Sequence, residues 1–385
     1  MVKQKLFSQM SSFKNKKVVE MFKNQDKDST NVYFSVQLKP VGNACNLRCN
    51  YCYAKSHLAT GKIMSDEILE ATIKKIIKQN YRYPTFSWHG GEPTLIGYEF
   101  FEFAVQLMEK YRRHKQTVYN LIQTNATRIN PELAELFSEN NFGVSISLDG
   151  SENIHGKNRK FINGTNSFTE VIKGVENLQE YNIEPLVICT VSKDNLPYVT
   201  ETFDFLISQG FRKIKYSPVF DSLTDNFSIT SDEWFEYLKK VFYRWFEIGD
   251  PEIQVRELDE VIVWLSNTSL NLCSSNKTCL NWISINPDGE IYPCEYLKEQ
   301  YRYGNIIEVE LNTIISSPQF LEFRRVFANN PTECQKCEFL KLCGNGCPTT
   351  RIKNNQISSD GVYAFCGQRK KLFYEIKKTF DKELN

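Results

Sequence analysis

Three cysteines near the start of the chain have a spacing that favours metal binding. Cys45, Cys49 and Cys52 follow the pattern C-x3-C-x2-C. Three thiolates can bind three irons of a [4Fe–4S] cluster, which leaves the fourth iron open to another ligand. An open metal position is typical of catalytic centres, whereas structural metal sites are closed. The alternative is a zinc site, for which His57, five residues after Cys52, could supply the fourth ligand.

The overall composition predicts a cytoplasmic protein without a nucleic-acid or membrane partner. Among the 385 residues, 47 Lys and Arg face 46 Asp and Glu, so the net charge of +1 gives no field that would attract a polyanion. A content of 41% hydrophobic residues is enough for a sizeable core. No run approaches the ~18 apolar residues of a membrane-spanning helix. The polar N-terminus also lacks the apolar core of a secretory signal.

The C-terminal third holds a second concentration of cysteines. Eight of the twelve cysteines lie there, the number that two four-cysteine sites require. They are Cys273, Cys279, Cys294, Cys334, Cys337, Cys343, Cys347 and Cys366. A reducing cytosol disfavours a disulfide framework, so such clusters indicate metal, with zinc and iron–sulfur centres both open. Cys189, in an apolar run, is predicted to be a buried core thiol.

Further polar segments could contact a bound cofactor. In Gly90-Gly91-Glu92-Pro93 two glycines allow the backbone to approach a ligand closely, and Glu92 can accept a hydrogen bond from an ammonium group. Other polar or aromatic candidates lie at or beyond the ends of later predicted strands: Gln123, Asn125, Ser147, Arg159 and Phe220. Asp149 is expected to shape its loop.

Strand and helix signals alternate through the first two thirds of the chain. Short segments rich in β-branched and aromatic residues predict strands at 33–39, 84–89, 117–123, 142–148, 184–191 and 213–218. Amphipathic stretches predict helices at 66–79, 98–111, 131–139, 168–181, 196–209 and 231–246. Six β/α units predict an α/β fold, a partial (β/α)6 TIM-like barrel with its chemistry at the carboxyl ends of the strands. The first three cysteines follow strand one, as this fold requires.

The alternation stops near Gly249-Asp250-Pro251. We therefore predict an N-terminal extension at 1–31, a barrel at 32–249 and a second, cysteine-rich domain at 250–385. In that domain a Pro-Asp-Gly turn at 287–289 predicts a hairpin of strands at 283–286 and 290–292. Helices are predicted at 256–264, 318–327 and 369–382.

The segment Cys45-x3-Cys49-x-Tyr51-Cys52 resembles the signature of the radical S-adenosylmethionine (SAM) enzymes. In that family SAM chelates the open iron, and one electron from the cluster splits the sulfonium to give a 5′-deoxyadenosyl radical. The radical then takes a hydrogen atom from the substrate. The cofactors carry the chemistry, and the protein supplies binding and orientation.

The resemblance also implies roles for the candidate residues. Tyr51 would pack near the adenine, and the segment of Gly90, Gly91 and Glu92 would contact the amino group of SAM. Ser147 and Arg159 would reach its ribose and carboxylate. Gln123 and Asn125 would hydrogen-bond polar groups of the ligand, and Phe220 would cover the adenine.

The C-terminal cysteines resemble the SPASM extension of radical SAM enzymes that modify peptides and proteins. The shared elements are a C-x5-C pair, a Tyr-Pro-Cys after a hairpin, a C-x2-C-x5-C-x3-C run and a final cysteine. The resemblance implies two further [4Fe–4S] clusters, each with four cysteine ligands and no open iron. The first auxiliary set would be Cys273, Cys279, Cys294 and Cys347. The second auxiliary set would be Cys334, Cys337, Cys343 and Cys366.

Within this group the sequence is most similar to anaerobic sulfatase-maturating enzymes, through Lys39-Pro40-Val41-Gly42 before the first cysteine and the Gly-Gly-Glu-Pro-Thr-Leu run at 90–95. Those enzymes oxidise Cys or Ser to formylglycine, with an Asp after the Tyr-Pro-Cys cysteine as general base. Here that residue is Glu295, and His89 stands where a Gln is usual. One extra methylene moves the carboxylate, and a base must lie within hydrogen-bond reach of its proton.

Because of these differences, the sequence favours oxidative modification of a ribosomal peptide, such as a crosslink or thioether, with Glu295 as the catalytic base. Sulfatase maturation is the alternative, and a non-catalytic zinc-binding scaffold is a distant one. The expected partners are a peptide or protein substrate and an electron donor such as flavodoxin or ferredoxin.

Overall fold

The structure is a computed structural model of the 385-residue chain. It describes residues 33–54, 62–79, 82–220, 226–265, 278–297, 301–353, 356–358 and 361–384. Cys273 and His57 lie outside these ranges, so their predicted ligand roles stay predictions.

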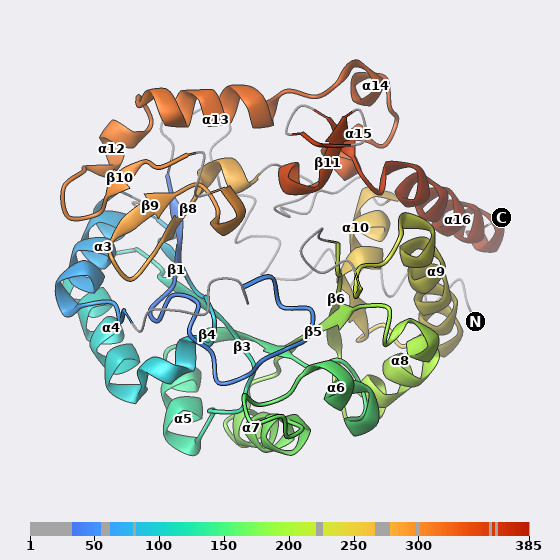
Figure 1. Cartoon of the computed structure of the whole chain (residues 1–385), viewed down its shortest axis with the longest axis horizontal. Coiled ribbons are helices and arrows are strands. Elements are labelled where there is room, and N and C mark those ends of the chain that lie inside the picture. Colours follow the sequence, from blue (N-terminus) through green and yellow to red (C-terminus); the bar gives the residue numbers. More distant parts are fainter. Residues whose placement is uncertain are drawn as a thin grey trace.

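Six parallel strands form the centre of the molecule, in chain order (Figure 1). They are β1 (Ser35–Leu38), β2 (Thr85–Trp88), β3 (Tyr119–Thr124), β4 (Phe142–Ser147), β5 (Leu186–Val191) and β6 (Lys213–Pro218). Each strand pairs with the next in parallel register, for example Val36 with Phe86 and Val187 with Ile214. The predicted α/β fold with a partly open, barrel-like parallel sheet is confirmed.

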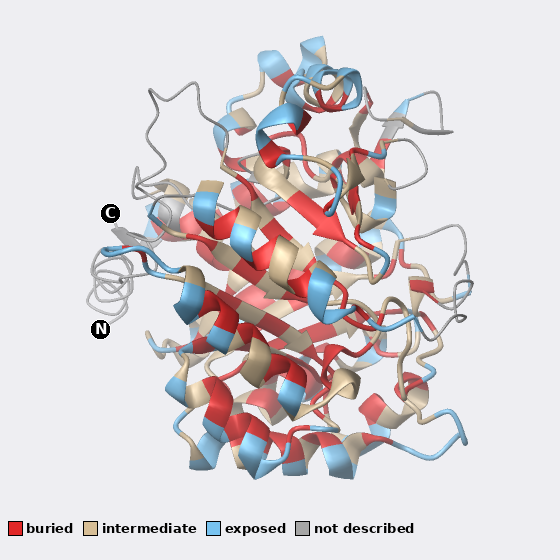
Figure 2. Cartoon of the chain, turned by 90° about the vertical axis from the view of Figure 1, so that its left-hand side faces the viewer, coloured by how far each residue is buried: buried red, intermediate tan, exposed pale blue. Residues whose placement is uncertain are grey.

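Helices connect these strands and cover the outer face of the sheet (Figure 1). They are α3 (Asp66–Gln79), α4 (Tyr98–Tyr111), α5 (Pro131–Glu139), α6 (Glu152–Asn158), α7 (Phe168–Glu180), α8 (Val199–Ser208) and α9 (Ser231–Ile248). Their exposed residues face outward and the strands between them are buried (Figure 2). The predicted bounds hold closely because local signals fix them. Thr230 and Glu233 form a capping box that begins α9, and Gly249, with φ of 61°, ends it.

The C-terminal region adds strands to both edges of the same sheet. At one edge β7 (Gln254–Val255) pairs with β6. At the other, β8 (Trp282–Ile285) pairs in parallel with β1 and then turns back through β9 (Glu290–Tyr292) to β10 (Gly304–Asn305). The predicted hairpin is therefore confirmed. The pairing of β8 with β1 was not predicted, because the sequence pattern of a strand does not indicate which other strand it pairs with.

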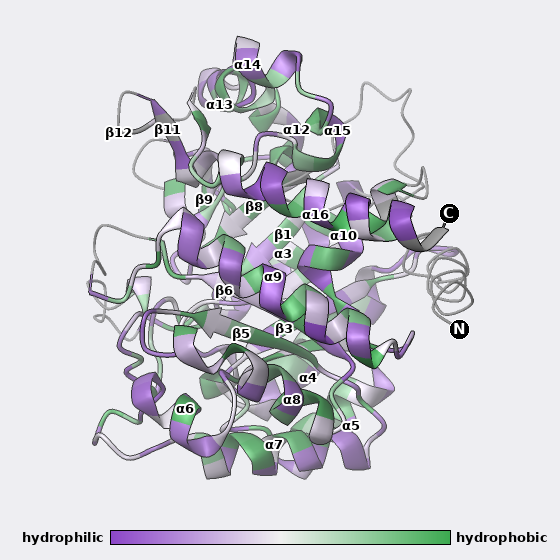
Figure 3. Cartoon of the chain, turned by 90° about the vertical axis from the view of Figure 1, so that its right-hand side faces the viewer, coloured by the Kyte–Doolittle hydropathy of each residue, from purple (hydrophilic) through white to green (hydrophobic). Residues whose placement is uncertain are grey.

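Further helices and a small sheet build the rest of the C-terminal region (Figure 1). The helices are α10 (Arg256–Leu265), α12 (Leu311–Ile314), α13 (Pro318–Ala328), α14 (Thr332–Gln335), α15 (Leu340–Cys343) and α16 (Cys366–Leu384). A small sheet holds β11 (Arg351–Lys353) between β12 (Gln356–Ile357) and β13 (Val362–Tyr363). α16 packs against α9, and both helices turn hydrophobic faces inward (Figure 3).

One apolar core joins the sheet to its helices. Cys189 on β5 is fully buried in it, as predicted, and burial raises the pKa of its thiol well above the usual range. None of the helices that the structure describes combines the length and apolarity that a membrane span needs.

Candidate active site

The loop of the first three cysteines leaves β1 and crosses the open end of the barrel. Two backbone hydrogen bonds fasten it to the segment after α6: Arg48 N–H donates to Lys160 O (2.7 Å) and Asn50 N–H donates to Asn158 O (3.0 Å). Leu47 forms a β-bridge with Phe161. The loop is therefore held to the end of α6 and the residues after it, at the barrel mouth where the fold predicts the chemistry.

The two glycines after β2 let a second loop pack directly against the cysteine loop. Gly91 N–H donates to Gly42 O and Glu92 N–H donates to Ala44 O, both at 2.8 Å. A Cβ on Gly90 would lie 2.5 Å from Gly42 O, and one on Gly91 would lie 2.0 Å from Ala44 O. Both positions therefore require glycine for contact between two protein loops. The close approach to a ligand, which the sequence suggested as their reason, stays a prediction.

Glu92 is fully buried and acts as an internal anchor. Its Oε1 accepts hydrogen bonds from Thr94 N–H, the Thr94 hydroxyl (2.6 Å) and the Thr124 hydroxyl (2.7 Å). Its Oε2 accepts from Asn125 N–H at 2.6 Å. Burial raises the pKa of this carboxyl, and these donors offset part of that effect. The observed role is thus to join the ends of β2 and β3. The predicted contact with an ammonium group is an additional role that no contact here tests.

The polar residues at the end of β3 point to the cysteine loop and to β2. Asn125 Nδ2 lies 2.9 Å from Asn46 Oδ1 and 3.8 Å from Cys45 Sγ. Gln123 Oε1 lies 3.1 Å from His89 Nε2. Burial, followed by the charge of Lys39, lowers the pKa of His89 to about 4, so this imidazole is neutral near pH 7.

Asp149, just beyond β4, is the anchor of the opposite side of the mouth. It is buried, and it accepts hydrogen bonds from the Tyr51 hydroxyl and from Thr190 N–H (2.9 Å). Arg159 Nε lies 3.0 Å from the same carboxylate, and its guanidinium lies over the Tyr51 ring at 5.4 Å. Ser147, at the end of β4, is also buried. Tyr51 and Arg159 are thus brought together by Asp149, and the contacts of Tyr51, Ser147 and Arg159 with SAM remain predictions.

The first three cysteines fit an iron–sulfur cluster, in which the irons carry positive charge. Each cysteine is half-buried. Burial raises the pKa of Cys45 to about 12, with smaller effects from Glu92, Cys49 and Cys52, which are its electrostatic neighbours. Thiolates are the form of cysteine that binds metals, and the positive charge of a bound cluster would favour that form at Cys45. Within the described ranges no three His, Cys, Asp or Glu side chains converge on one ion position. A four-iron cluster needs no such convergence, because each thiolate binds a separate iron.

The second auxiliary set comes together as the resemblance implied. Cys334, Cys337, Cys343 and Cys366 all line one small cavity of about 40 Å³. Burial raises the pKa of Cys334 to about 11, and the next contributions come from Cys366, Cys343 and Cys337. Four mutually adjacent cysteines around one cavity fit a four-thiolate site.

The first auxiliary set is only partly described, because Cys273 is not. Cys279 and Cys347 are both electrostatic neighbours of the buried Arg351. Cys294 follows β9 and is a neighbour of Tyr53, the residue after Cys52. Cys294 therefore lies on the side of the C-terminal region that faces the cysteine loop, and Cys279 and Cys347 lie beside Arg351.

Glu295 forms a buried ion pair across the barrel mouth. Its Oε1 lies 2.7 Å from Lys39 Nζ, with side chains 9% and 2% exposed. Lys39 follows β1, and Glu295 follows Cys294 and begins a short 3₁₀ turn at Glu295–Leu297. The pair joins the cysteine loop of the barrel to the C-terminal region.

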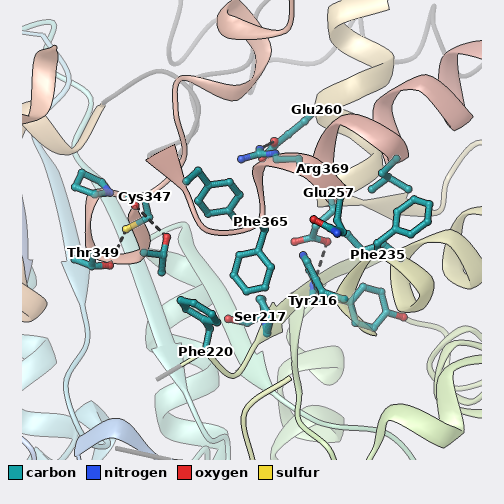
Figure 4. Close-up of a pocket in the computed structure, with 18 of the residues that line it drawn as sticks. Tyr216, Ser217, Phe220, Phe235, Glu257, Glu260, Cys347, Thr349, Phe365 and Arg369 are labelled. Carbon is teal, nitrogen blue, oxygen red and sulfur yellow. Dashed lines mark hydrogen bonds and ion pairs between the residues drawn. The ribbon is translucent and has the colours of Figure 1, made fainter. Parts of the chain in front are cut away.

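A cavity of about 870 Å³ opens between β6, α10 and the C-terminal region (Figure 4). Phe220 and Phe365 meet there with ring centroids 4.6 Å apart, while Cys347 and Thr349 form the opposite wall. Tyr296 also lines the cavity and contacts Tyr53, with ring centroids 4.8 Å apart and the ring planes tilted by 39°. Phe220 is thus a cavity-wall residue, and its predicted contact with adenine is not tested.

The polar end of this cavity holds carboxylates that the sequence did not single out. Glu257 accepts a hydrogen bond from Tyr216 N–H at 3.1 Å, and burial raises its pKa to about 7. Glu260 pairs with Arg369 at 2.8 Å. Acidic residues near the start of a helix are common, so Glu257 and Glu260 gave no functional signal in the sequence. Lys39 did carry a functional signal in the sequence, because it is a charged residue directly after an apolar strand.

Comparisons with known proteins agree with this geometry. The chain matches the family model of the radical SAM superfamily over residues 40–206 and that of the SPASM iron–sulfur cluster-binding domain over residues 273–338. It is 29% identical to a cysteine-type anaerobic sulfatase-maturating enzyme of Clostridium perfringens, over 88% of this chain and 95% of that one. It is 28% identical to a serine-type enzyme of Bacteroides thetaiotaomicron, over 86% of each chain.

Solved structures of related enzymes are also similar to this chain. The structure described as native anSMEcpe with bound AdoMet and Cp18Cys peptide is 30% identical, with a TM-score of 0.81 and coverage of 90% of this chain and 97% of that one. Streptococcus suis SuiB bound to S-adenosylmethionine, 17% identical with a TM-score of 0.61 over 87% of this chain, shares the fold. The protein is an enzyme that uses SAM and [4Fe–4S] clusters. The chain therefore belongs to the radical SAM superfamily and carries its SPASM domain.

Proposed function

We propose that this enzyme oxidises a Cys or Ser side chain of a sulfatase peptide to formylglycine. The observation that carries the proposal is the buried pair of Lys39 and Glu295, which places a carboxylate between the two cysteine regions. The relatives support it, because both cysteine-type and serine-type sulfatase-maturating enzymes match most of this chain. The sequence alone favours modification of a ribosomal peptide, and the relatives favour sulfatase maturation instead.

The residues predicted from the sequence fit the cofactors. We propose that Cys45, Cys49 and Cys52 hold the SAM-binding cluster and that the eight C-terminal cysteines hold the two auxiliary clusters. The SAM contacts would come from Tyr51, Gly90, Gly91, Glu92, Gln123, Asn125, Ser147, Arg159 and Phe220. When bound, SAM and the clusters would supply a radical that takes a hydrogen atom from substrate and an acceptor for the second electron.

Glu295 has the proton-transfer role. Loss of a hydrogen atom from the substrate Cβ leaves one proton and one electron to remove before the side chain becomes a thioaldehyde or aldehyde. Glu295 takes the proton from the substrate sulfur or oxygen. Water then converts a thioaldehyde to formylglycine and releases hydrogen sulfide. The ion pair with Lys39, at 2.7 Å, fixes the longer side chain of Glu295 and so compensates for the methylene that distinguishes Glu from Asp.

The large cavity is the proposed site of the peptide. It lies beside the barrel mouth, and its aromatic wall of Phe220, Phe365 and Tyr296 can exclude water from the reacting side chain. The solved relative binds a peptide in addition to AdoMet. We further propose residues 32–249 and 250–385 as the two functional domains after an extension at 1–31, a cytoplasmic location, and a flavodoxin or ferredoxin as electron donor.

Modification of a ribosomal peptide is the second candidate. Glu295 and His89 favour it, since both differ from the residues usual in sulfatase-maturating enzymes. His89 lies beside Gln123 and near the Lys39 pair, so it belongs to the part of the mouth that would meet a substrate.

Peptide oxidation distinguishes these candidates. The reconstituted enzyme would be incubated under anaerobic conditions with SAM, dithionite and a synthetic sulfatase peptide that carries Cys, Ser or Ala at the modified position. We expect an aldehyde, trapped by a hydrazide and located by mass spectrometry, in the Cys or Ser peptide and none in the Ala peptide. Deoxyadenosine without aldehyde in either peptide would contradict sulfatase maturation and favour the second candidate.

A further inference from the structure

A three-residue segment separates the two auxiliary cysteine sets. Gly344, Asn345 and Gly346 lie between Cys343 and Cys347 and have φ angles of 58°, 65° and 61°. Cys343 lines the small cavity of the second set, whereas Cys347 lines the large cavity. These three residues, all with left-handed backbone conformation, lead the chain directly from a cysteine of one proposed cluster to a cysteine of the other.

Arg351, the first residue of β11, binds the backbone of this segment. Its side chain is fully buried, and its guanidinium donates to Asn345 O (Nε, 3.1 Å) and to Gly346 O (Nη2, 3.5 Å). β11 is fixed in turn by its pairing with β13, in which Arg351 lies opposite Tyr363. The guanidinium therefore has a defined place beside the backbone that links the two sets.

The charge of Arg351 acts on cysteines of both sets. Its largest electrostatic interactions are with Cys347 and Cys279, of the first auxiliary set, and with Cys334 and Cys343, of the second. A guanidinium stays charged in proteins, and a fully buried charge has a longer electrostatic reach than an exposed one.

We propose that Arg351 is a positioning residue shared by the two auxiliary clusters and that its charge raises the reduction potential of both. The proposal rests on the proposed assignment of the eight cysteines. Reduction adds one electron, and thus one negative charge, to a cluster already negative through its thiolates. A fixed neighbouring cation stabilises the reduced form more than the oxidised form. Both sites would become better one-electron acceptors.

Arg369 differs from Arg351 in the cysteines that lie near it. The guanidinium of Arg369 is near Cys343, of the second auxiliary set, and pairs with the carboxylate of Glu260 at 2.8 Å. Arg369 also follows Cys366 on α16 and lines the small cavity, so it lies on the side of the second set.

Redox titration followed by electron paramagnetic resonance tests this proposal. The full-length chain would carry Cys45, Cys49 and Cys52 as Ala, so that only the auxiliary signals remain, and dithionite would be the reductant. In this background R351Q is expected to make reduction of each site about tenfold less favourable, or ~59 mV for one electron. R351K, which keeps the charge, is expected to shift both potentials less. R325Q, on the exposed face of α13, is the control and is expected to shift neither.

Iron content decides what each result means. Unchanged potentials in an R351Q protein with its full iron content would overturn the proposal, and so would a shift at one site only. If R351Q fails to retain iron, N345D decides, because it adds a carboxylate to the same segment and is expected to lower both potentials. Unchanged potentials in N345D would then overturn the proposal. No peptide is used, so failure of sulfatase maturation leaves this result intact, whereas absence of auxiliary iron from the parent overturns it.

Discussion

The barrel mouth and the C-terminal cysteine region are supported in different ways. In the mouth, anchors such as Glu92 and Asp149 are buried and hydrogen-bonded to several strand ends at once. In the C-terminal region the cysteines lie on helices of one turn and on left-handed turns, around a cavity. We therefore expect the protein itself to assemble the mouth and metal binding to contribute to folding of the C-terminal region.

Replacement of the first three cysteines gives the largest effect on activity and the sharpest test of a preassembled mouth. In C45A/C49A/C52A we expect deoxyadenosine formation to fall below detection, because no open iron remains for SAM. The melting temperature should stay near that of the parent, since the loop is fastened by backbone hydrogen bonds. Cys189→Ala, in the core, is the control and should still cleave SAM. A large fall in melting temperature of the triple variant would contradict preassembly.

Removal of Lys39 tests the link between the two regions. K39M leaves the buried carboxylate of Glu295 without its cation, which should lower the free energy of unfolding by about 3–5 kcal/mol. Peptide oxidation should fall more than deoxyadenosine formation. Glu295 acts on the substrate after SAM has been cleaved, and its position depends on Lys39. Urea unfolding and product ratios measure the two effects. K213M, which breaks an exposed ion pair, should change stability by less than about 0.5 kcal/mol. Equal effects of both variants would argue against the link.

Substitution of Glu92 tests whether the stability of the mouth depends on its buried, hydrogen-bonded anchors. E92Q replaces an acceptor oxygen by an amide donor among four protein donors, which should cost about 2–4 kcal/mol of unfolding free energy. Chemical denaturation measures this loss. E67Q, on the exposed face of α3, is the matched control. A loss below ~1 kcal/mol in E92Q would show that other contacts hold the mouth.

Acidification should weaken the mouth through its buried histidines. The folded-state pKa of His89, about 4, lies below the ordinary value of 6.5, so the unfolded chain takes up a proton first as pH falls. Stability should therefore be fully present above pH ~6.5 and decrease toward pH ~4, by about 3 kcal/mol for this group. His155 contributes in the same window. H89Q should flatten part of the pH dependence of urea midpoints, whereas H114Q, on an exposed loop, should not. Identical pH profiles of H89Q and the parent would exclude this contribution.

Local signals explain why much of the fold could be predicted from the sequence. The predicted α3, α4 and α5 match the observed bounds, because caps and apolar spacing define them. The pairing of β8 with β1 and of β7 with β6 could not be predicted, since these contacts depend on residues far apart in the chain.

The same distinction applies to the site. Motif spacing identified the cysteines, and four of them do surround one cavity. The meaning of Lys39 and Arg351 depends on partners that only the folded chain brings close. Glu92 was identified, but its partners at the end of β3 show an anchoring role that spacing does not reveal.

Hydrogen–deuterium exchange of the full-length protein with and without its iron tests the central contrast most directly. We expect iron removal to increase exchange strongly at α14, α15 and the start of α16, and to leave β3, β4 and the Glu92 loop unchanged. An equal increase in both regions would contradict the account, because the mouth would then depend on metal as much as the C-terminal region does. No increase in either region would also contradict it.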